Sequence, residues 1–233
     1  MKFAIIAAGE GSRLAAEGIN VPKPLVEVQG QPLVARLHHI FSTLQAEEVV
    51  IIANCLHPET SAYIRQLAAR GQGAPIRLIE KTTPGSLISF YTLSPWLQGS
   101  DFCLTTVDTV FRSEEFAAYV RHFAHTPCDG LMAVTDYIDD EKPLYVGTDG
   151  ELRITGFYDT PHHCRYISGG IYMLRPKALT VLQQCVDGGK VRMRDFQRAL
   201  VEAGLDLRAY PFGKILDVDH AADIAKAEAF LRG

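Results

Sequence analysis

The first apolar run of the chain ends in a glycine-rich turn, and this junction limits the possible folds more than any other feature. Residues 2–8 are almost wholly apolar, which is typical of a strand buried on both faces of a sheet. Gly9 and Gly11 follow directly, and Arg13 comes next. Glycines permit a sharp turn whose backbone N–H groups face outward, where they bind anions. The junction therefore predicts a strand, turn and helix that receive a phosphate chain, and an ordinary turn with solvated charges is the alternative.

Strand-like and helix-like segments alternate after this junction. Apolar runs typical of buried strands cover 48–53, 76–81 and 102–107, and helical spacing of apolar residues covers 32–44, 58–70 and 87–97. This alternation predicts a parallel sheet with helices on both faces. The expected fold class is α/β, a Rossmann-like three-layer α/β/α arrangement with a mixed, mainly parallel sheet.

The second half of the chain is less regular. We expect strands at 130–135, 166–174 and 207–218, a hairpin joining 144–147 to 152–157, and helices near 177–186, 194–203 and 221–231. The paired glycines Gly169 and Gly170 in one of these strands indicate close approach of a ligand or of another backbone. Because no linker, repeat or low-complexity segment interrupts the sequence, residues 1–233 are expected to form a single domain.

Bulk composition limits the possible partners and compartment. The net charge of −4 over 233 residues gives no electrostatic footprint for nucleic acid or an anionic membrane. No apolar run reaches the roughly 20 residues of a membrane span, and no signal peptide is recognisable at the start. The five cysteines include no Cys-x-x-Cys pair, which favours free thiols in a reducing cytoplasm.

Several polar residues fall where predicted strands end. Asp108 follows the strand 102–107, Gly85 and Ser86 follow 76–81, and Asp217 and Asp219 come late in the chain. Ligands of open α/β sheets bind at the carboxyl ends of the strands. Paired carboxylates beside a phosphate site are what Mg²⁺ requires, although an aspartate after a strand is also a common helix cap.

The residues named so far carry a family resemblance. Ala-Ala-Gly-Glu-Gly-Ser-Arg-Leu (7–14) followed by Pro-Lys-Pro-Leu (22–25) resembles the signature of sugar-phosphate nucleotidyltransferases. Val-Gln-Gly-Gln-Pro-Leu (28–33), Thr-Thr-Val-Asp (105–108), Ser-Gly-Gly-Ile-Tyr (168–172) and Leu-Asp-Val-Asp (216–219) are similar to later motifs of that family. The resemblance extends over nearly the whole chain and implies the fold of nucleotide-diphospho-sugar transferases.

The resemblance implies an enzyme in which a substrate phosphate attacks the α-phosphorus of a nucleoside triphosphate, UTP or CTP, and releases pyrophosphate. It implies catalytic roles for Arg13 and Lys23. The residues expected at the nucleotide are Ala7, Ala8, Gly9, Gly11, Ser12, Asn54, Gly85 and Ser86, those at the acceptor are Tyr145, Gly169 and Gly170, and those at Mg²⁺ or Mn²⁺ are Asp108, Asp217 and Asp219. Relatives of this kind commonly form dimers or tetramers, so a homo-oligomer is expected.

The sequence departs from the family where the acceptor binds. A second Glu-Lys-Pro motif of the family, whose lysine binds the sugar phosphate, is replaced by Phe-Tyr-Asp-Thr-Pro (157–161). Asn-Cys-Leu-His (54–57) resembles a loop of muramate-phosphate uridylyltransferases, which favours a sugar 1-phosphate. Ser-Phe-Tyr-Thr-Leu (89–93) resembles phosphocholine cytidylyltransferases, and the acidic residues 139–141 near Tyr137 and Tyr145 are able to hold a quaternary ammonium group. A non-catalytic nucleotide-binding module is the third possibility.

Overall fold

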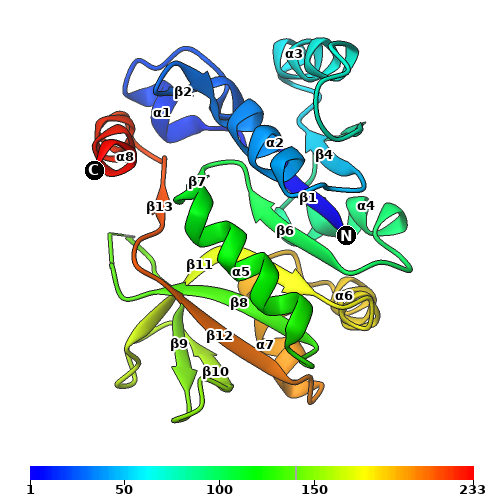
Figure 1. Cartoon of the computed structure of the whole chain (residues 1–233), viewed down its shortest axis with the longest axis vertical. Coiled ribbons are helices and arrows are strands. Elements are labelled where there is room, and N and C mark those ends of the chain that lie inside the picture. The colour runs from blue at the N-terminus through cyan, green and yellow to red at the C-terminus, as the bar shows by residue number, and fades with distance from the viewer. Residues whose placement is uncertain (140) are drawn as a thin grey trace.

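A computed structural model of the chain describes residues 1–139 and 141–233 (Figure 1). Its strands are β1 (Lys2–Ala7), β2 (Glu27–Val28), β3 (Gln31–Pro32), β4 (Val49–Ala53), β5 (Ile76–Glu80), β6 (Phe102–Thr106), β7 (Thr109–Val110), β8 (Gly130–Thr135), β9 (Tyr145–Thr148), β10 (Ile154–Tyr158), β11 (Tyr166–Leu174), β12 (Leu207–Phe212) and β13 (Leu216–Asp217). Its α-helices are α1 (Ser12–Ala16), α2 (Leu33–Thr43), α3 (Pro58–Ala69), α4 (Ser86–Leu93), α5 (Ser113–His125), α6 (Ala178–Asp187), α7 (Met193–Glu202) and α8 (Ala221–Arg232). Short 3₁₀ turns cover Lys23–Leu25 and Ser94–Trp96.

A nine-stranded mixed sheet forms the centre of the described part of the chain. Its order is β10-β9-β11-β6-β1-β4-β5, with β8 beside β11 and β12 beside β8. The run β6-β1-β4-β5 is parallel throughout, and β11 lies antiparallel to both β6 and β8. The parallel run brings the carboxyl ends of β1 and β6 to the same edge, where the glycine turn and Asp108 begin. The predicted mixed α/β sheet is confirmed.

Two apolar cores pack on the opposite faces of this sheet. Phe3 and Ile5 of β1 face one core with the buried residues of α2 and α5, and Figure 1 shows these two helices on the near side of the sheet. Ala4 and Ile6 face the other core, which contains buried residues of α4, α6 and α7. Successive β1 residues alternate between the cores because strand side chains point to opposite faces. The three layers predicted from the apolar runs are therefore present.

The predicted strand at 207–218 is in fact two strands. β12 runs parallel to β8 as far as Phe212, and the chain then turns away before β13 pairs antiparallel with β7. Gly213 lies at the break, and its N–H donates to Glu115 of α5 at 2.6 Å. After this break the chain leaves the sheet and reaches β7, at the carboxyl end of β6. Helix α8 then follows and lies beside β2 (Figure 1). None of the helices described here is long and apolar enough to cross a bilayer.

Candidate active site

A cleft of about 410 Å³ opens at the carboxyl ends of β1 and β6. Its lining comprises residues 6–13, 23–24, 83–86, 89, 106–108 and 219. The predicted nucleotide residues Ala7, Ala8, Gly9, Gly11, Ser12, Gly85 and Ser86 are among them, as are Arg13, Lys23 and Asp108. Segments far apart in the sequence thus meet here, at the sheet edge where open α/β folds bind ligands.

The glycine turn is shaped by two glycines with different surroundings. Gly11 has a φ of 65°, in the left-handed region that favours glycine, and it immediately precedes α1. A Cβ at Gly9 would meet no atom within 4 Å, so this residue borders open space in the cleft. Asn54 is buried behind the turn, where its Nδ2 donates to the Ala8 carbonyl at 3.1 Å and its Oδ1 accepts from Leu56 N. Asn54, predicted to contact the nucleotide, is not among the residues that line the cleft, and it supports the turn that does.

The opposite wall is formed by the turn at Gly85 and Ser86. A Cβ on Gly85 would lie 2.5 Å from the Val191 carbonyl oxygen, so only glycine lets these two backbones approach. The Leu87 N–H donates to the same carbonyl at 3.0 Å, and Ser86 Oγ accepts from Met193 N at 3.3 Å. This wall of the cleft is therefore fixed by the loop that connects α6 to α7.

An ionic cluster closes one end of the cleft. Lys23 Nζ donates to Asp108 Oδ2 at 2.5 Å and to Asp219 Oδ1 at 2.6 Å. Arg13 NH1 lies 3.0 Å from the second oxygen of Asp219. The Lys23 side chain is 12 % exposed and that of Arg13 is 52 % exposed, so Lys23 forms the floor of the cluster and Arg13 its rim.

The opposite charges in this cluster offset the cost of burying each charged group. Burial by itself would raise the pKa of Asp108, but the charge and hydrogen bond of Lys23 outweigh it and lower the pKa below its usual value. Burial likewise opposes the charge of Lys23, and the two carboxylates raise its pKa. Both groups are therefore ionised at neutral pH, as charge neutralisation of phosphates or a metal requires.

The β7–β13 ladder explains how a late aspartate reaches Asp108. Leu216 pairs with Val110 and Asp217 with Thr109, and the Val218 N–H donates to the Asp108 carbonyl at 3.1 Å. Asp219 follows and reaches Lys23. Sequence motifs predicted Asp108, Asp217 and Asp219 together, and in the structure Asp219 is the one that shares Lys23 with Asp108.

The donor set fits a hard divalent cation. Asp108 Oδ1 is buried and has no hydrogen-bond partner among the described residues, which is costly unless another group satisfies it. Carboxylate oxygens are the ligands that Mg²⁺ and Mn²⁺ prefer. No cluster of three or more histidine, cysteine or acidic side chains placed for a metal occurs within the described residues. Two aspartates completed by substrate oxygens and water are nevertheless the usual arrangement for Mg²⁺.

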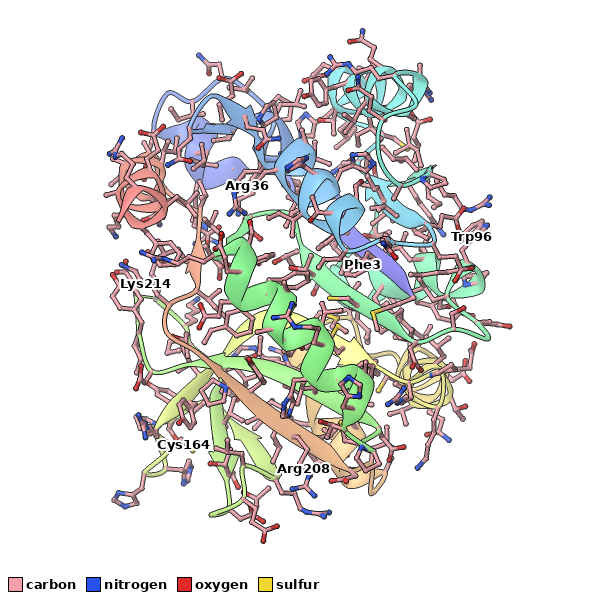
Figure 2. All side chains as sticks on the ribbon, viewed as in Figure 1. Phe3, Arg36, Trp96, Cys164, Arg208 and Lys214 are labelled. Carbon is pink, nitrogen blue, oxygen red and sulfur yellow. The ribbon has the colours of Figure 1, made fainter. Side chains whose placement is uncertain are left out.

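A second cleft, of about 230 Å³, adjoins the first and shares Arg13 and Asp219 with it. Asp217, Gly169, Tyr137 and Lys226 are among its lining residues, and so are Asp139, Glu141, His220 and Asp223. Carboxylates thus outnumber cations in this cleft. Lys214 lies beside it, between β12 and β13, with Nζ 4.0 Å from the centre of the Tyr137 ring (Figure 2).

The three residues predicted at the acceptor have different positions. Gly169 lines the second cleft, and a Cβ there would meet Ile215 Cδ1. Gly170, with a φ of 72°, faces the hydroxyls of Thr106 and Thr109 where β11 is bulged. Tyr145 is paired with Ile167, a residue of the second cleft, on the adjacent strand. The paired glycines therefore admit neighbouring protein groups.

Glu17 and His220 were not predicted and link the two halves of the site. Glu17 Oε1 lies 2.6 Å from His220 Nδ1, and its Oε2 accepts from Ala221 N at 2.7 Å. The Glu17 hydrogen bond raises the pKa of His220. Glu17 follows α1, which carries Arg13, and His220 is the N-cap of α8, so this contact holds Arg13 near Asp219. No sequence signal identified it, because histidine is not a preferred helix cap.

Solved structures of two proteins show the same fold. The inositol-1-phosphate CTP transferase from T. maritima has a TM-score of 0.79 and 18% identity over 99% of this chain and 97% of its own. A putative glucose-1-phosphate thymidylyltransferase from Bacillus anthracis, in complex with a sucrose, has a TM-score of 0.86 and 18% identity over 100% of this chain and 95% of its own. The predicted nucleotide-diphospho-sugar transferase fold is confirmed.

Curated relatives match over part of their length. The bifunctional protein GlmU of Methanococcus aeolicus is 20% identical over 226 residues, which is 90% of this chain and 50% of the relative. The bifunctional enzyme IspD/IspF of Clavibacter michiganensis is 39% identical over 72 residues, which is 30% of this chain and 17% of the relative. This chain therefore spans half or less of these two relatives.

A family model matches most of the chain. The model of the MobA-like NTP transferase domain aligns with residues 3–202, which include Arg13, Lys23, Asp108 and both walls of the first cleft. The resemblance to nucleotidyltransferases predicted from the motifs is confirmed at the level of the family. The chain belongs to the MobA-like NTP transferase domain family.

Proposed function

We propose that this protein transfers a nucleotidyl group from a nucleoside triphosphate, UTP or CTP, to a phosphorylated small molecule and releases pyrophosphate. The observation that carries the proposal is the convergence of Arg13, Lys23, Asp108 and Asp219 where two clefts adjoin. One cleft has the glycine turn that suits a triphosphate, and the other is the place for an acceptor. A nucleotide-binding module has no need of the second cleft.

The side chains of the cluster suit this transfer. Arg13 at the rim binds the β- and γ-phosphates and balances the charge that develops on pyrophosphate. Lys23 binds the α-phosphate and the incoming acceptor phosphate, which brings the two reacting groups together. Because the attacking phosphate oxygen is already an anion, no general base is required. Backbone at Ala8, Gly9 and Gly85 lines the space for the base.

Asp108 and Asp219 would hold the divalent cation, with Asp217 on the neighbouring wall of the second cleft. The unpartnered Asp108 Oδ1 supports this assignment. A bound Mg²⁺ or Mn²⁺ supplies Lewis-acid polarisation of the phosphoryl oxygens. The chain's own part is to keep Asp108 ionised, which Lys23 does, and to keep the two carboxylates adjacent, which the β7–β13 ladder does.

A sugar 1-phosphate is the first candidate for the acceptor. The solved neighbours are described as acting on inositol 1-phosphate and glucose 1-phosphate, and their fold extends over nearly this entire chain. Arg13 is shared between the two clefts, so one cation contacts the donor and faces the acceptor. This arrangement supports an acceptor phosphate held next to the donor phosphates, whatever sugar carries it.

A phospho-alcohol with a cationic group, such as phosphocholine, is the second candidate, and the charge of the second cleft favours it. Asp139, Glu141, Asp217 and Asp223 line this cleft, which suits a positively charged headgroup. Asp140, the remaining acid of the predicted loop, lies outside the described residues. One face of Tyr137 is covered by Lys214, so carboxylates and not an aromatic cage would provide the attraction.

The test is pyrophosphate release measured with Mg²⁺, with CTP and UTP first and then the other triphosphates. Each is combined with sugar 1-phosphates, inositol 1-phosphate and phosphocholine. Turnover with a sugar or inositol phosphate alone supports the first acceptor, and turnover with phosphocholine alone supports the second. Tight triphosphate binding without release of pyrophosphate for any acceptor would identify a binding module and contradict the proposal.

The compartment, domain organisation and oligomeric state of the enzyme are also part of what we propose. We place it in the cytoplasm, which is supported by the five unpaired cysteines of the described residues. We also propose that residues 1–233 act as one domain and form a homo-oligomer. Light scattering on the purified chain measures the oligomeric state directly, and a monomeric mass at micromolar concentration would refute the homo-oligomer.

A further inference from the structure

The carboxylates proposed for the metal are already engaged by cations of the chain. Lys23 Nζ contacts Asp108 Oδ2 and Asp219 Oδ1, and Arg13 NH1 contacts Asp219 Oδ2. Three of the four carboxylate oxygens therefore have a positively charged donor within 3.0 Å. The fourth, Asp108 Oδ1, is buried without a hydrogen-bond partner among the described residues. The side chain of Lys23 therefore occupies the position between Asp108 and Asp219 where a metal cation would bind.

A divalent cation and the Lys23 ammonium compete for the same space. A metal bound to both aspartates would lie within a few ångströms of Nζ, and like charges at that separation in a half-buried site repel strongly. The lysine has a flexible stem and is able to move, whereas the aspartates are held by the β7–β13 ladder. Metal binding therefore requires a new partner for Lys23.

We propose that Lys23 keeps divalent cations off the Asp108–Asp219 pair until a nucleotide binds, and that the phosphates then draw Lys23 away and admit the metal. This inference rests on the proposed function for the identity of the phosphate ligand. Lys23 and Arg13 both line the first cleft, so phosphates placed there offer each cation an alternative anion. By linkage, nucleotide and metal then strengthen each other's binding by the same factor.

The test is titration of the full chain with Mn²⁺ alone, followed by electron paramagnetic resonance of the free ion. Lys23→Met removes the charge and keeps an apolar stem, and Lys23→Gln keeps a polar group in case the first variant folds poorly. We expect either variant to bind one Mn²⁺ about tenfold or more tightly than the wild-type chain, since a unit charge leaves both carboxylates. Adding Asp108→Asn to either variant should remove the gain.

Lys226 provides the matched control. Its Nζ lies 2.9 Å from Asp139 Oδ2 and 3.1 Å from Asp223 Oδ1, so it too bridges two carboxylates. The second oxygen of Asp223 already accepts from the backbone N–H groups of Asp219 and His220. Lys226→Met should therefore raise Mn²⁺ affinity far less than Lys23→Met does.

Two results would overturn the inference. One is a wild-type chain that binds Mn²⁺ without nucleotide as tightly as the folded Lys23 variants do. The other is a Lys226→Met variant that gains as much affinity as Lys23→Met. Because no substrate is used, an inactive substrate panel leaves this outcome unaffected, and failure of one proposal is separable from failure of the other.

Discussion

At the scale of single residues, the site depends on opposite charges that lie together in a half-buried cluster. Asp108 is the most constrained of them, since it lies at a strand end, contacts Lys23 and has one oxygen without a partner in the described structure. Its carbonyl also accepts from Val218 N, so the backbone of this residue joins β7 to β13. Changing its side chain alters the charge and leaves that backbone contact in place.

Asp108→Asn is expected to lower turnover by about a hundredfold or more, because the cation loses a carboxylate ligand and Lys23 loses its negative partner. The fold should be retained, since the amide is isosteric with the carboxyl group. Steady-state pyrophosphate release and circular dichroism measure the two effects. Asp187→Asn, at the end of α6 where Asp187 accepts from Gln183, is the control and should keep wild-type turnover. Near-normal activity of the Asp108 variant would remove it from the site.

Tyr119 gives a stability prediction with a definite pH dependence. Its hydroxyl is buried, donates to the Leu131 carbonyl and accepts from Met173 N at 3.1 Å. Burial raises the pKa of Tyr119 well above 10, whereas an unfolded tyrosine ionises near 10. The contribution of Tyr119 to stability is therefore complete below about pH 10 and is lost as the pH rises above it.

Tyr119→Phe should lower the free energy of unfolding at pH 7 by about 1–3 kcal/mol, because Met173 N and the Leu131 carbonyl lose their partner. Between pH 10 and 11 the variant should lose stability less steeply than the wild-type chain. Part of the slope remains, since burial also raises the pKa of Tyr172 to about 12. Urea titrations at each pH measure this, and parallel slopes would contradict the assignment.

At the scale of elements, the two turns of the first cleft differ in what their glycines are for. Gly9 faces open space, whereas Gly85 faces the Val191 carbonyl, which also accepts from the first turn of α4. The first glycine leaves room for a ligand and the second leaves room for the protein. Alanine at each position separates the two requirements.

Gly9→Ala should keep the melting temperature and weaken nucleotide binding by about tenfold or more, because the new methyl group occupies the cleft. Gly85→Ala should lower stability by about 1–3 kcal/mol, because its Cβ would lie 2.5 Å from a backbone oxygen. Thermal melts and calorimetric titration with CTP or UTP measure both quantities. Equal losses of stability in the two variants would show that the distinction is wrong.

The elements themselves were largely predictable, because buried strands and amphipathic helices have periods that the sequence shows. The two-residue strands β7 and β13 have no period to detect, and so the break after Phe212 was missed. For the same reason the sequence did not distinguish Asp217 from Asp219, which differ only in where the chain leaves β13. Lys226 gave no signal, since an exposed lysine on a helix is ordinary.

At the scale of the whole molecule, the two cores share the strands of one sheet. Phe41 packs on Phe3 at 4.4 Å between ring centres on one face, and Phe90 packs on Phe196 at 5.4 Å on the other. Neither core is complete without β1, whose side chains alternate between them. The proposal of a single domain implies that these faces cannot unfold separately.

Phe41→Ala and Phe90→Ala should each lower the free energy of unfolding by about 3–5 kcal/mol. Each variant should still unfold in one transition, at a lower temperature than the wild-type chain. Differential scanning calorimetry detects a second transition if the faces unfold independently. A variant that splits the transition would divide the chain into two folding units and contradict the single domain. Fluorescence of Trp96 and far-ultraviolet circular dichroism should move together in both variants.

Lys23 joins residues that are 85 and 196 positions away along the chain. Closing loops of that length is slow compared with forming local turns, so these contacts should be among the last to form during refolding. During refolding, the recovery of nucleotide binding should therefore be slower than the recovery of helix content. The substrate-binding site would then form in the last step of folding, and the rate at which binding recovers would measure how fast the native state is completed.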